Sequence, residues 1–296
     1  MAKGLQHIRI ISPSGHLDPS LIDGACARLR AWGYLVSEGA HARDEYGRFA
    51  GTDDDRLSDL IEALRDPQVD MILCARGGYG MQRIIDRVPP INKPIIGFSD
   101  ITALHQLAGL NAQASLHASM CKYIATMPET SEPMVAFRRA LAGEPLEYTF
   151  ASHPFNRQGE ASAPIVGGNL SVLYGLQGTP FGLNRFSGQF PILLIEDIGE
   201  RHYHIDRMLR NLRLSGVLAH LSGLIVGQFT DCEDDSSMPG GSVQQTIYEA
   251  VADYDYPVLF DAPFGHVTGN LPIWLHTESR LSVTPDGAKL FLSQTL

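Results

Sequence analysis

The 296-residue sequence predicts an α/β protein built from two domains. In the first half, short apolar segments alternate with segments of helical spacing, which is typical of a parallel sheet covered by helices. Residues 143–165 are polar and rich in turn-forming residues, which indicates a domain crossing. At the end, apolar and polar residues alternate around Pro285-Asp286-Gly287, the pattern of a hairpin. We therefore predict an N-terminal domain over 1–150, a linker over 151–165 and a C-terminal domain over 166–296.

The N-terminal half carries four apolar segments that predict strands, each followed by a helical segment. Strands are expected at 7–12, 33–39, 69–75 and 93–98, and helices at 19–32, 53–66, after Gly80 and at 100–110. Thr52 and the three aspartates after it are typical of a helix start, where a side-chain oxygen accepts backbone N–H groups and negative charge is favoured. Ligands of parallel sheets bind at the carboxyl ends of the strands. Three loops follow strands in this way: Pro13-Ser14-Gly15, Arg76-Gly77-Gly78-Tyr79-Gly80 and Gly97-Phe98-Ser99-Asp100.

The second half continues the alternation before the closing hairpin. Strands are expected at 191–197, 223–229 and 257–261, and helices at about 200–214 and 242–253. Polar side chains again stand at strand ends. Glu196 is the first polar residue where the strand Ile192–Ile195 runs out, and His266 follows the last of these strands after a Pro-Phe-Gly turn.

Composition excludes several classes of function. The formal net charge is −10 and no dense Lys/Arg cluster occurs, so we expect no nucleic-acid partner. No segment has the length of a membrane span or the character of a secretory signal. The four cysteines are scattered, which favours a reducing, cytoplasmic compartment. No His, Cys and carboxylate set has zinc spacing and no glycine-rich nucleotide motif is complete, so we expect neither a metal nor a cofactor.

Ser99 stands where a predicted strand ends and a predicted helix begins, which leaves two interpretations. Serine at this position often only caps a helix. A Gly-x-Ser turn between strand and helix also holds the nucleophile of many hydrolases, although the second glycine of that motif is missing here. In that case the N–H of Asp100 would stabilise a developing oxyanion. The Gly77–Gly80 turn would supply a second donor or, alternatively, bind a phosphate.

A serine nucleophile needs a base and a group that orients the base. Glu196 and His266 occupy strand ends as Ser99 does, and the order Ser, Glu, His matches triads on doubly wound sheets. Glu196 taken alone is also explained as a cap of the following helix, and His266 as a loop histidine. The sequence leaves open whether Glu196 or Asp197 would face the imidazole, because neighbouring strand residues point to opposite faces.

Five segments together resemble one family. They are Arg76-Gly77-Gly78-Tyr79-Gly80, Gly97-Phe98-Ser99-Asp100, Gly167-Gly168-Asn169-Leu170, Glu196-Asp197 and Phe264-Gly265-His266. Their order and intervals resemble the LD-carboxypeptidases of serine peptidase family S66, which include muropeptide-recycling enzymes and microcin C self-immunity peptidases. The resemblance covers nearly the whole chain.

This resemblance implies a triad of Ser99, Glu196 and His266, with an oxyanion hole made by the backbone amides of Gly78 and Asp100. It implies an N-terminal α/β domain similar to class I glutamine amidotransferases, a C-terminal domain rich in β-structure, and a homodimer. The implied reaction is release of the terminal D-alanine from a cytoplasmic murein tetrapeptide, a small peptide substrate. Its terminal carboxylate would be bound by the side chain of Arg76 or Asn169.

Three alternatives remain at the level of sequence. The same chemistry could act on a peptidyl-adenylate, as in microcin C self-immunity. The fold could also serve as a non-catalytic ligand-binding relative, although all three triad positions are occupied. A glutamine-amidotransferase-like enzyme is disfavoured because no cysteine follows a strand in the required setting.

Overall fold

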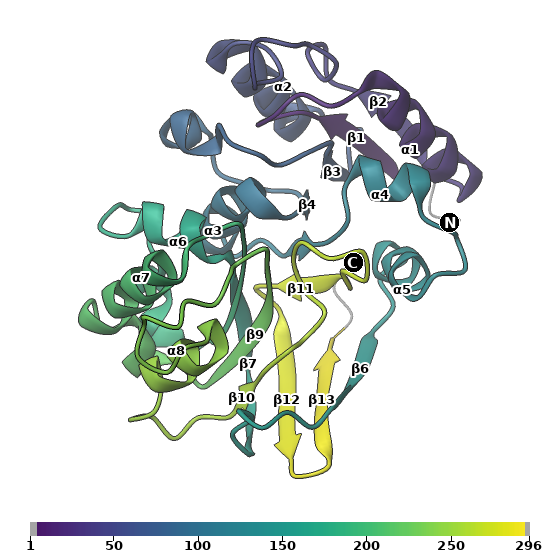
Figure 1. Cartoon of the computed structure of the whole chain (residues 1–296). Coiled ribbons are helices and arrows are strands. Elements are labelled where there is room, and N and C mark those ends of the chain that lie inside the picture. The colour runs from purple at the N-terminus through teal and green to yellow at the C-terminus, as the bar shows by residue number, and fades with distance from the viewer. Residues whose placement is uncertain (1–4, 294–296) are drawn as a thin grey trace. The chain divides into compact units, whose positions relative to one another are not determined.

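The computed structural model describes residues 5–293, and the chain forms two compact units, residues 1–138 and 139–296. The division falls within helix α5 (Glu132–Leu141), some ten residues before the predicted end of the first domain. Figure 1 shows the elements of both units in chain order. No helix within residues 5–293 is long and apolar enough to cross a membrane.

Unit 1 contains the predicted parallel sheet, with the strand order β5-β4-β3-β1-β2. Its strands are β1 (His7–Ile11), β2 (Leu35–Glu38), β3 (Met71–Cys74), β4 (Ile95–Gly97) and β5 (Ser115–His117). Its helices are α1 (Pro19–Ala31), α2 (Asp53–Arg65), α3 (Thr102–Leu110) and α4 (Cys121–Thr126), besides α5. The central strands β3 and β4 are apolar on both faces, since the consecutive residues Ile72 and Leu73, and Ile95 and Ile96, are fully buried.

Helix α2 begins where the sequence predicts. Thr52 accepts the N–H of Asp55, and the Asp55 carboxylate accepts the N–H of Thr52, a reciprocal capping box. The helix expected after Gly80 is wrong, because the segment forms two 3₁₀ turns, Met81–Arg83 and Ile85–Arg87. Only bonds to the third residue back form there, and the pair Pro89-Pro90 prevents a longer helix.

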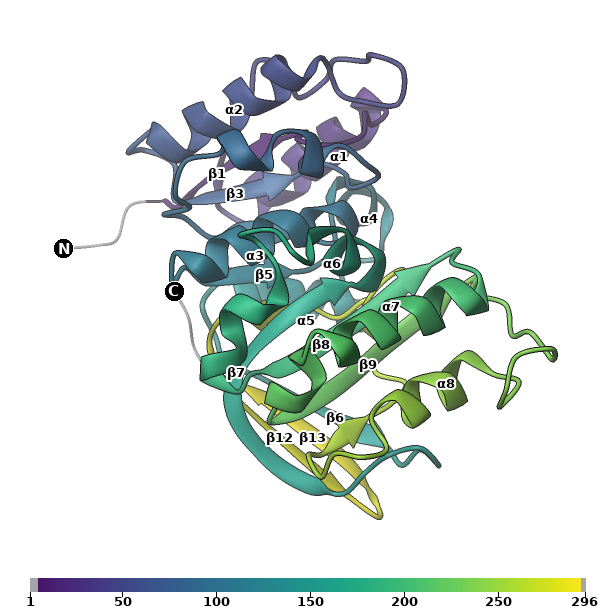
Figure 2. The same cartoon turned by 90° about the vertical axis from the view of Figure 1, so that its left-hand side faces the viewer.

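Unit 2 is built on one seven-stranded sheet of order β10-β9-β8-β7-β12-β13-β6. The strands of this sheet are β6 (Leu146–Ala151), β7 (Gly159–Asn169), β8 (Ile192–Ile198), β9 (Gly223–Thr230), β10 (Val258–Leu259), β12 (Glu278–Thr284) and β13 (Gly287–Leu292). Strand β11 (Ile273–Leu275) comes between β10 and β12 in the sequence and is not part of this sheet. Helices α6 (Leu170–Leu176), α7 (His202–Leu214) and α8 (Val243–Ala250) lie along the parallel strands (Figure 2). The predicted closing hairpin is β12 and β13.

Strand β7 joins two kinds of pairing. Its residues 165–169 pair in parallel with β8, whereas residues 159–164 pair antiparallel with β12. Residues 151–165, expected as a linker, therefore include the end of β6 and much of β7. Their polar composition has a simple cause, since Glu160 and Ser162 face water while Ala161 and Ala163 are buried.

The cysteines are distributed unevenly over the two units. Cys26, Cys74 and Cys121 are buried in unit 1, whereas Cys232 is partly exposed in the acidic loop between β9 and α8. None of the four forms a disulfide bond. Three of them therefore serve as small apolar core residues.

Candidate active site

Ser99 sits on a strained turn directly after strand β4. Its φ is 67°, in the left-handed region that side chains other than glycine rarely adopt. It opens a 3₁₀ turn, Ser99–Ile101, that leads into helix α3. A sharp, strained turn between strand and helix is how a hydrolase presents a nucleophile clear of its sheet. This conformation favours the hydrolase interpretation of Ser99, because a serine that only caps a helix does not need a left-handed backbone.

The glycine turn after β3 lies against Ser99. A Cβ added to Gly77 would lie 2.8 Å from the Ser99 Cβ and 3.1 Å from its Oγ, so only glycine fits there. Gly78 adopts φ 104°, which also favours glycine. The two loops that carry the predicted oxyanion donors, Gly78 and Asp100, are thus neighbours within unit 1.

The Asp100 side chain is buried among the strand-end loops. Its Oδ2 accepts the Ser14 hydroxyl at 2.6 Å and the N–H of Met81 at 2.9 Å. Burial raises the pKa of Asp100, and these two hydrogen bonds, followed by the charge of Arg56, act against that rise. Asp100 thus has a side-chain function separate from the predicted function of its backbone amide.

In unit 2, Glu196 and His266 form a hydrogen-bonded pair. The Oε2 atom of Glu196 lies 2.7 Å from Nδ1 of His266. The Glu196 side chain is fully buried at the end of β8, while that of His266 is 15% exposed. Gly265, at φ 116°, permits this approach, because a Cβ there would lie 2.6 Å from Oε2. A carboxylate on Nδ1 fixes the imidazole so that Nε2 can accept a proton.

Asp197 points away from this pair and holds the start of helix α6. Its carboxylate accepts the amide group of Asn169 at 2.9 Å and the N–H groups of Ser171 and Ile198 at 2.8 and 2.9 Å. Burial, and then the negative charge of Glu196, raise the pKa of Asp197 to about 7. The sequence left open which acid meets the imidazole, and in the structure it is Glu196.

The two residues predicted to bind the substrate carboxylate have different surroundings. Asn169 is buried, and its Oδ1 accepts the N–H of Val172 at 3.1 Å as the cap of α6. Arg76 is exposed in unit 1, where its Nη1 donates to the backbone oxygen of His16 at 2.7 Å. An exposed guanidinium retains donors for a ligand, whereas the amide of Asn169 already holds local structure.

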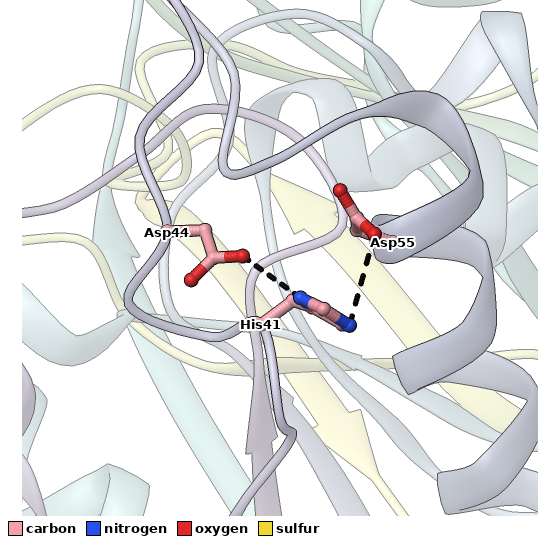
Figure 3. A group of neighbouring side chains, drawn as sticks. All are labelled: His41, Asp44 and Asp55. Atoms are coloured by element: carbon pink, nitrogen blue, oxygen red, sulfur yellow. Dashed lines mark hydrogen bonds and ion pairs between the residues drawn. The ribbon is translucent and has the colours of Figure 1, made fainter.

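One cluster among residues 5–293 has the geometry of metal ligands. His41, Asp44 and Asp55 offer ligand atoms that all lie within 4.8 Å of one another (Figure 3). Nδ1 of His41 contacts Asp44 at 2.8 Å, and Nε2 lies 3.7 Å from Asp55. Asp55 also serves the capping box of α2. These contacts explain the cluster as an ion-pair network.

Sequence reasoning missed Arg56, which lies completely buried beside the loops that follow β1 and β3. The available signal is its place on helix α2: Arg56 falls on the same helical face as the buried Leu57, Leu60 and Leu64. A charged residue on an apolar face indicates a buried partner.

The comparisons with known proteins give the class of protein, a hydrolase of the carboxypeptidase type, and its family. The model of the LD-carboxypeptidase N-terminal domain matches residues 8–118, and that of the C-terminal domain matches residues 162–281. The chain belongs to the LD-carboxypeptidase family, S66. The "Probable murein peptide carboxypeptidase" of Bacillus subtilis is 33% identical over 90% of this chain and 85% of its own.

Two further relatives carry similar descriptions. The murein tetrapeptide carboxypeptidase of Pseudomonas aeruginosa is 27% identical over 89% of each chain. The crystal structure of muramoyltetrapeptide carboxypeptidase from Oxalobacter formigenes matches with a TM-score of 0.84 at 25% identity, covering 97% of this chain and 99% of that one. An MccF-like protein from Bacillus anthracis, at 22% identity and a TM-score of 0.80 over 99% of this chain and 98% of that one, shares the fold.

Proposed function

We propose that the protein is a serine LD-carboxypeptidase that releases the terminal D-alanine from murein tetrapeptides. The observation that carries the proposal is the buried Glu196 bound to Nδ1 of His266, combined with the strained turn at Ser99. The names of the relatives from Pseudomonas and Oxalobacter support the substrate class. In this proposal Ser99, His266 and Glu196 act as one triad.

The proposed reaction proceeds through an acyl-enzyme. Ser99 Oγ attacks the carbonyl carbon between the L-centre of the diamino acid and D-alanine, and its proton passes to Nε2 of His266. The amides of Gly78 and Asp100 donate to the oxyanion. When the carbon–nitrogen bond breaks, the amine of D-alanine takes the proton from His266. Water, deprotonated by the same imidazole, then hydrolyses the ester and restores Ser99.

Glu196 has an orienting role in this scheme. It accepts the N–H at Nδ1 and stabilises the imidazolium that forms when Ser99 is deprotonated. For the terminal carboxylate of the substrate we favour Arg76, because its guanidinium is exposed and can donate two parallel bonds. Asn169 would have to leave its contacts in the α6 cap to bind the same group.

We further propose that the enzyme acts in the cytoplasm, in peptidoglycan recycling, and as a homodimer. The absence of disulfide bonds among its four cysteines supports a reducing compartment. Fractionation of the producing cells and sedimentation of the purified protein test location and oligomeric state respectively.

Substitution of the triad tests the mechanism. Ser99→Ala and His266→Ala should each lower kcat for D-alanine release by about 10⁴-fold or more, because each removes a member of a unit that works together. Glu196→Gln should lower kcat by about 10³- to 10⁴-fold, since it retains the shape but favours the wrong imidazole tautomer. Free D-alanine is measured with D-amino acid oxidase.

His220→Ala serves as the control, because His220 is an exposed histidine of the same unit. It should keep wild-type kcat. Undiminished turnover by Ser99→Ala would exclude the serine mechanism. Hydrolysis of a peptidyl-adenylate without release of D-alanine by the wild-type protein would instead favour the microcin-type substrate.

A further inference from the structure

The carboxylate of Asp100 ties together three loops that follow parallel strands. Asp100 lies in the loop after β4, Ser14 in the loop after β1, and Met81 just after the glycine turn that follows β3. One oxygen, Oδ2, accepts from both Ser14 Oγ and the Met81 N–H. The Gly15 N–H also donates to the backbone oxygen of Gly77 at 2.9 Å. The residue whose amide is one proposed oxyanion donor therefore anchors the turn that holds the other.

Arg56 joins the same loops from the opposite side. Its Nη1 donates to the backbone oxygen of Pro13 at 2.6 Å and to that of Gly80 at 3.2 Å, and its Nη2 pairs with Asp53. Arg56 is 1% exposed and Asp100 is 2% exposed. A Cβ on Gly80 would lie 2.7 Å from Nη1, so the turn rests directly on the guanidinium. Both buried side chains contact the same peptide unit: Asp100 accepts the N–H of Met81 and Arg56 donates to the oxygen of Gly80. They therefore clamp the C-terminal end of the glycine turn, while the Gly15 N–H holds its first residue, Gly77.

We propose that Ser14 and Arg56 are positioning residues for the oxyanion hole: through Asp100 and Gly80 they fix the distance between the amides of Gly78 and Asp100. The inference rests on the proposed function, which assigns those amides to the oxyanion. This role would explain why the charged side chains of Arg56 and Asp100 are buried at this point. Apolar residues could have filled the space between the helix face and the three loops at a lower desolvation cost.

The chemistry makes such positioning consequential. Oxyanion donors act when they lie 2.7–3.1 Å from the charged oxygen of the transition state, and losing one donor costs about 10²- to 10³-fold in kcat. A turn of glycines has little stiffness of its own. External hydrogen bonds must therefore hold it, and their loss should act on the transition state more than on substrate binding.

Ser14→Ala is the test, with Ser12→Ala as its matched control. Both serines are buried in the segment that follows β1, and both donate one hydrogen bond of 2.6 Å. Ser12, however, donates to the backbone oxygen of Ala42 and not to Asp100. We expect Ser14→Ala to lower kcat by about 10-fold, within the range of a weakened oxyanion donor, with KM changed less than about two-fold. Ser12→Ala should leave both constants within about two-fold of wild type.

A boronic acid analogue of the diamino acid residue provides a second measurement. Ser99 Oγ adds to the three-coordinate boron while its O–H proton moves to His266, and no group leaves the boron. The four-coordinate boronate that forms is an anion, and one of its oxygens occupies the hole. The inhibition constant of this analogue should rise with Ser14→Ala by the factor by which kcat falls. The affinity for the product tripeptide, which places no oxyanion there, should stay constant.

Arg56→Lys is a second variant, for the case in which Ser14→Ala is poorly stable. It keeps the charge but loses the planar set of donors, and it should give the same kinetic pattern as Ser14→Ala. Unfolding midpoints of all variants are measured in parallel. Equal kinetic effects of Ser14→Ala and Ser12→Ala, or a loss carried by KM and product affinity, would overturn the inference while leaving the triad intact. Failure of the wild-type protein to release D-alanine would instead overturn the proposed function and the inference with it.

Discussion

Ser99 combines a reactive position with an unfavourable backbone. An L-residue at φ 67° costs about 1–2 kcal/mol relative to its usual conformations, and glycine does not incur that cost. Ser99→Gly should therefore raise the free energy of unfolding by about 0.5–1 kcal/mol while abolishing turnover. Urea denaturation and D-alanine release measure the two effects.

Ala112 supplies the control for this prediction. It has φ 53° at an exposed turn after α3, so Ala112→Gly should give a similar gain in stability with activity retained. If Ser99→Gly lowered stability where Ala112→Gly raised it, the interactions lost with the serine side chain would outweigh the relief of backbone strain.

At the scale of residues, the sequence predicts the side chains that belong to recognisable motifs and misses those whose function depends on tertiary packing. Ser99, Glu196 and His266 are predicted from their places at strand ends, and the pairing of Glu196 with His266 within unit 2 agrees with that prediction. The choice between Glu196 and Asp197 depends on an irregularity between Ile195 and Asp197 in the pairing of β8 with β9, which no motif announces. Ser14 and Arg56 act through contacts between distant segments, so their function appears only in three dimensions.

Among the elements, the start of helix α6 packs against Asp197, a carboxyl group whose pKa differs between the folded protein and its ordinary value. Its pKa is raised to about 7 in the folded protein, from an ordinary value of 3.8, by burial and by Glu196. A raised acid pKa means that the contribution to stability is complete below pH 4 and is lost as the pH rises through 7. Wild type should therefore lose stability relative to Asp197→Asn by up to about 1.4 kcal/mol per pH unit between these limits.

Chemical denaturation from pH 4.5 to 8 measures this difference. Asp206→Asn, at a partly exposed position of α7 where the carboxylate pairs with Arg210, is the control and should show a curve parallel to that of wild type. If the Asp197→Asn and wild-type curves also ran parallel, the carboxylate would be ionised throughout and the hydrogen bonds from Ser171 and Asn169 would dominate its environment.

Element prediction succeeds where periodicity is strong and fails where composition misleads. Strands β1 to β4 and helix α2 are confirmed, because apolar runs and a capping box define them locally. The segment after Gly80 has helical composition, yet it forms two 3₁₀ turns, and the prolines that follow prevent a longer helix. Residues 151–165 have the composition of a loop, and pairing with β12 makes much of this segment a strand.

At the scale of the whole molecule, the fold class predicted from the sequence is confirmed, with a parallel sheet in one unit and a mixed sheet in the other. The similarity of the N-terminal part to class I glutamine amidotransferases and the homodimer stay predictions. Alternation along the chain identifies the class because it reflects burial of every strand. The position of the boundary between the units, within α5, depends on which distant segments each part of the helix contacts. The sequence around α5 does not contain that information.

The uneven burial of the four cysteines makes the wild-type chain ready for site-specific labelling. A maleimide fluorophore should attach at Cys232, with a stoichiometry near one dye per chain, while the buried thiols of Cys26, Cys74 and Cys121 stay unmodified until the protein unfolds. Burial raises the pKa of Cys232 to about 11, so labelling will be slow and will quicken toward pH 9. Cys232→Ser should abolish it. The dye would then report, without any engineered mutation, on the acidic loop beside helix α8.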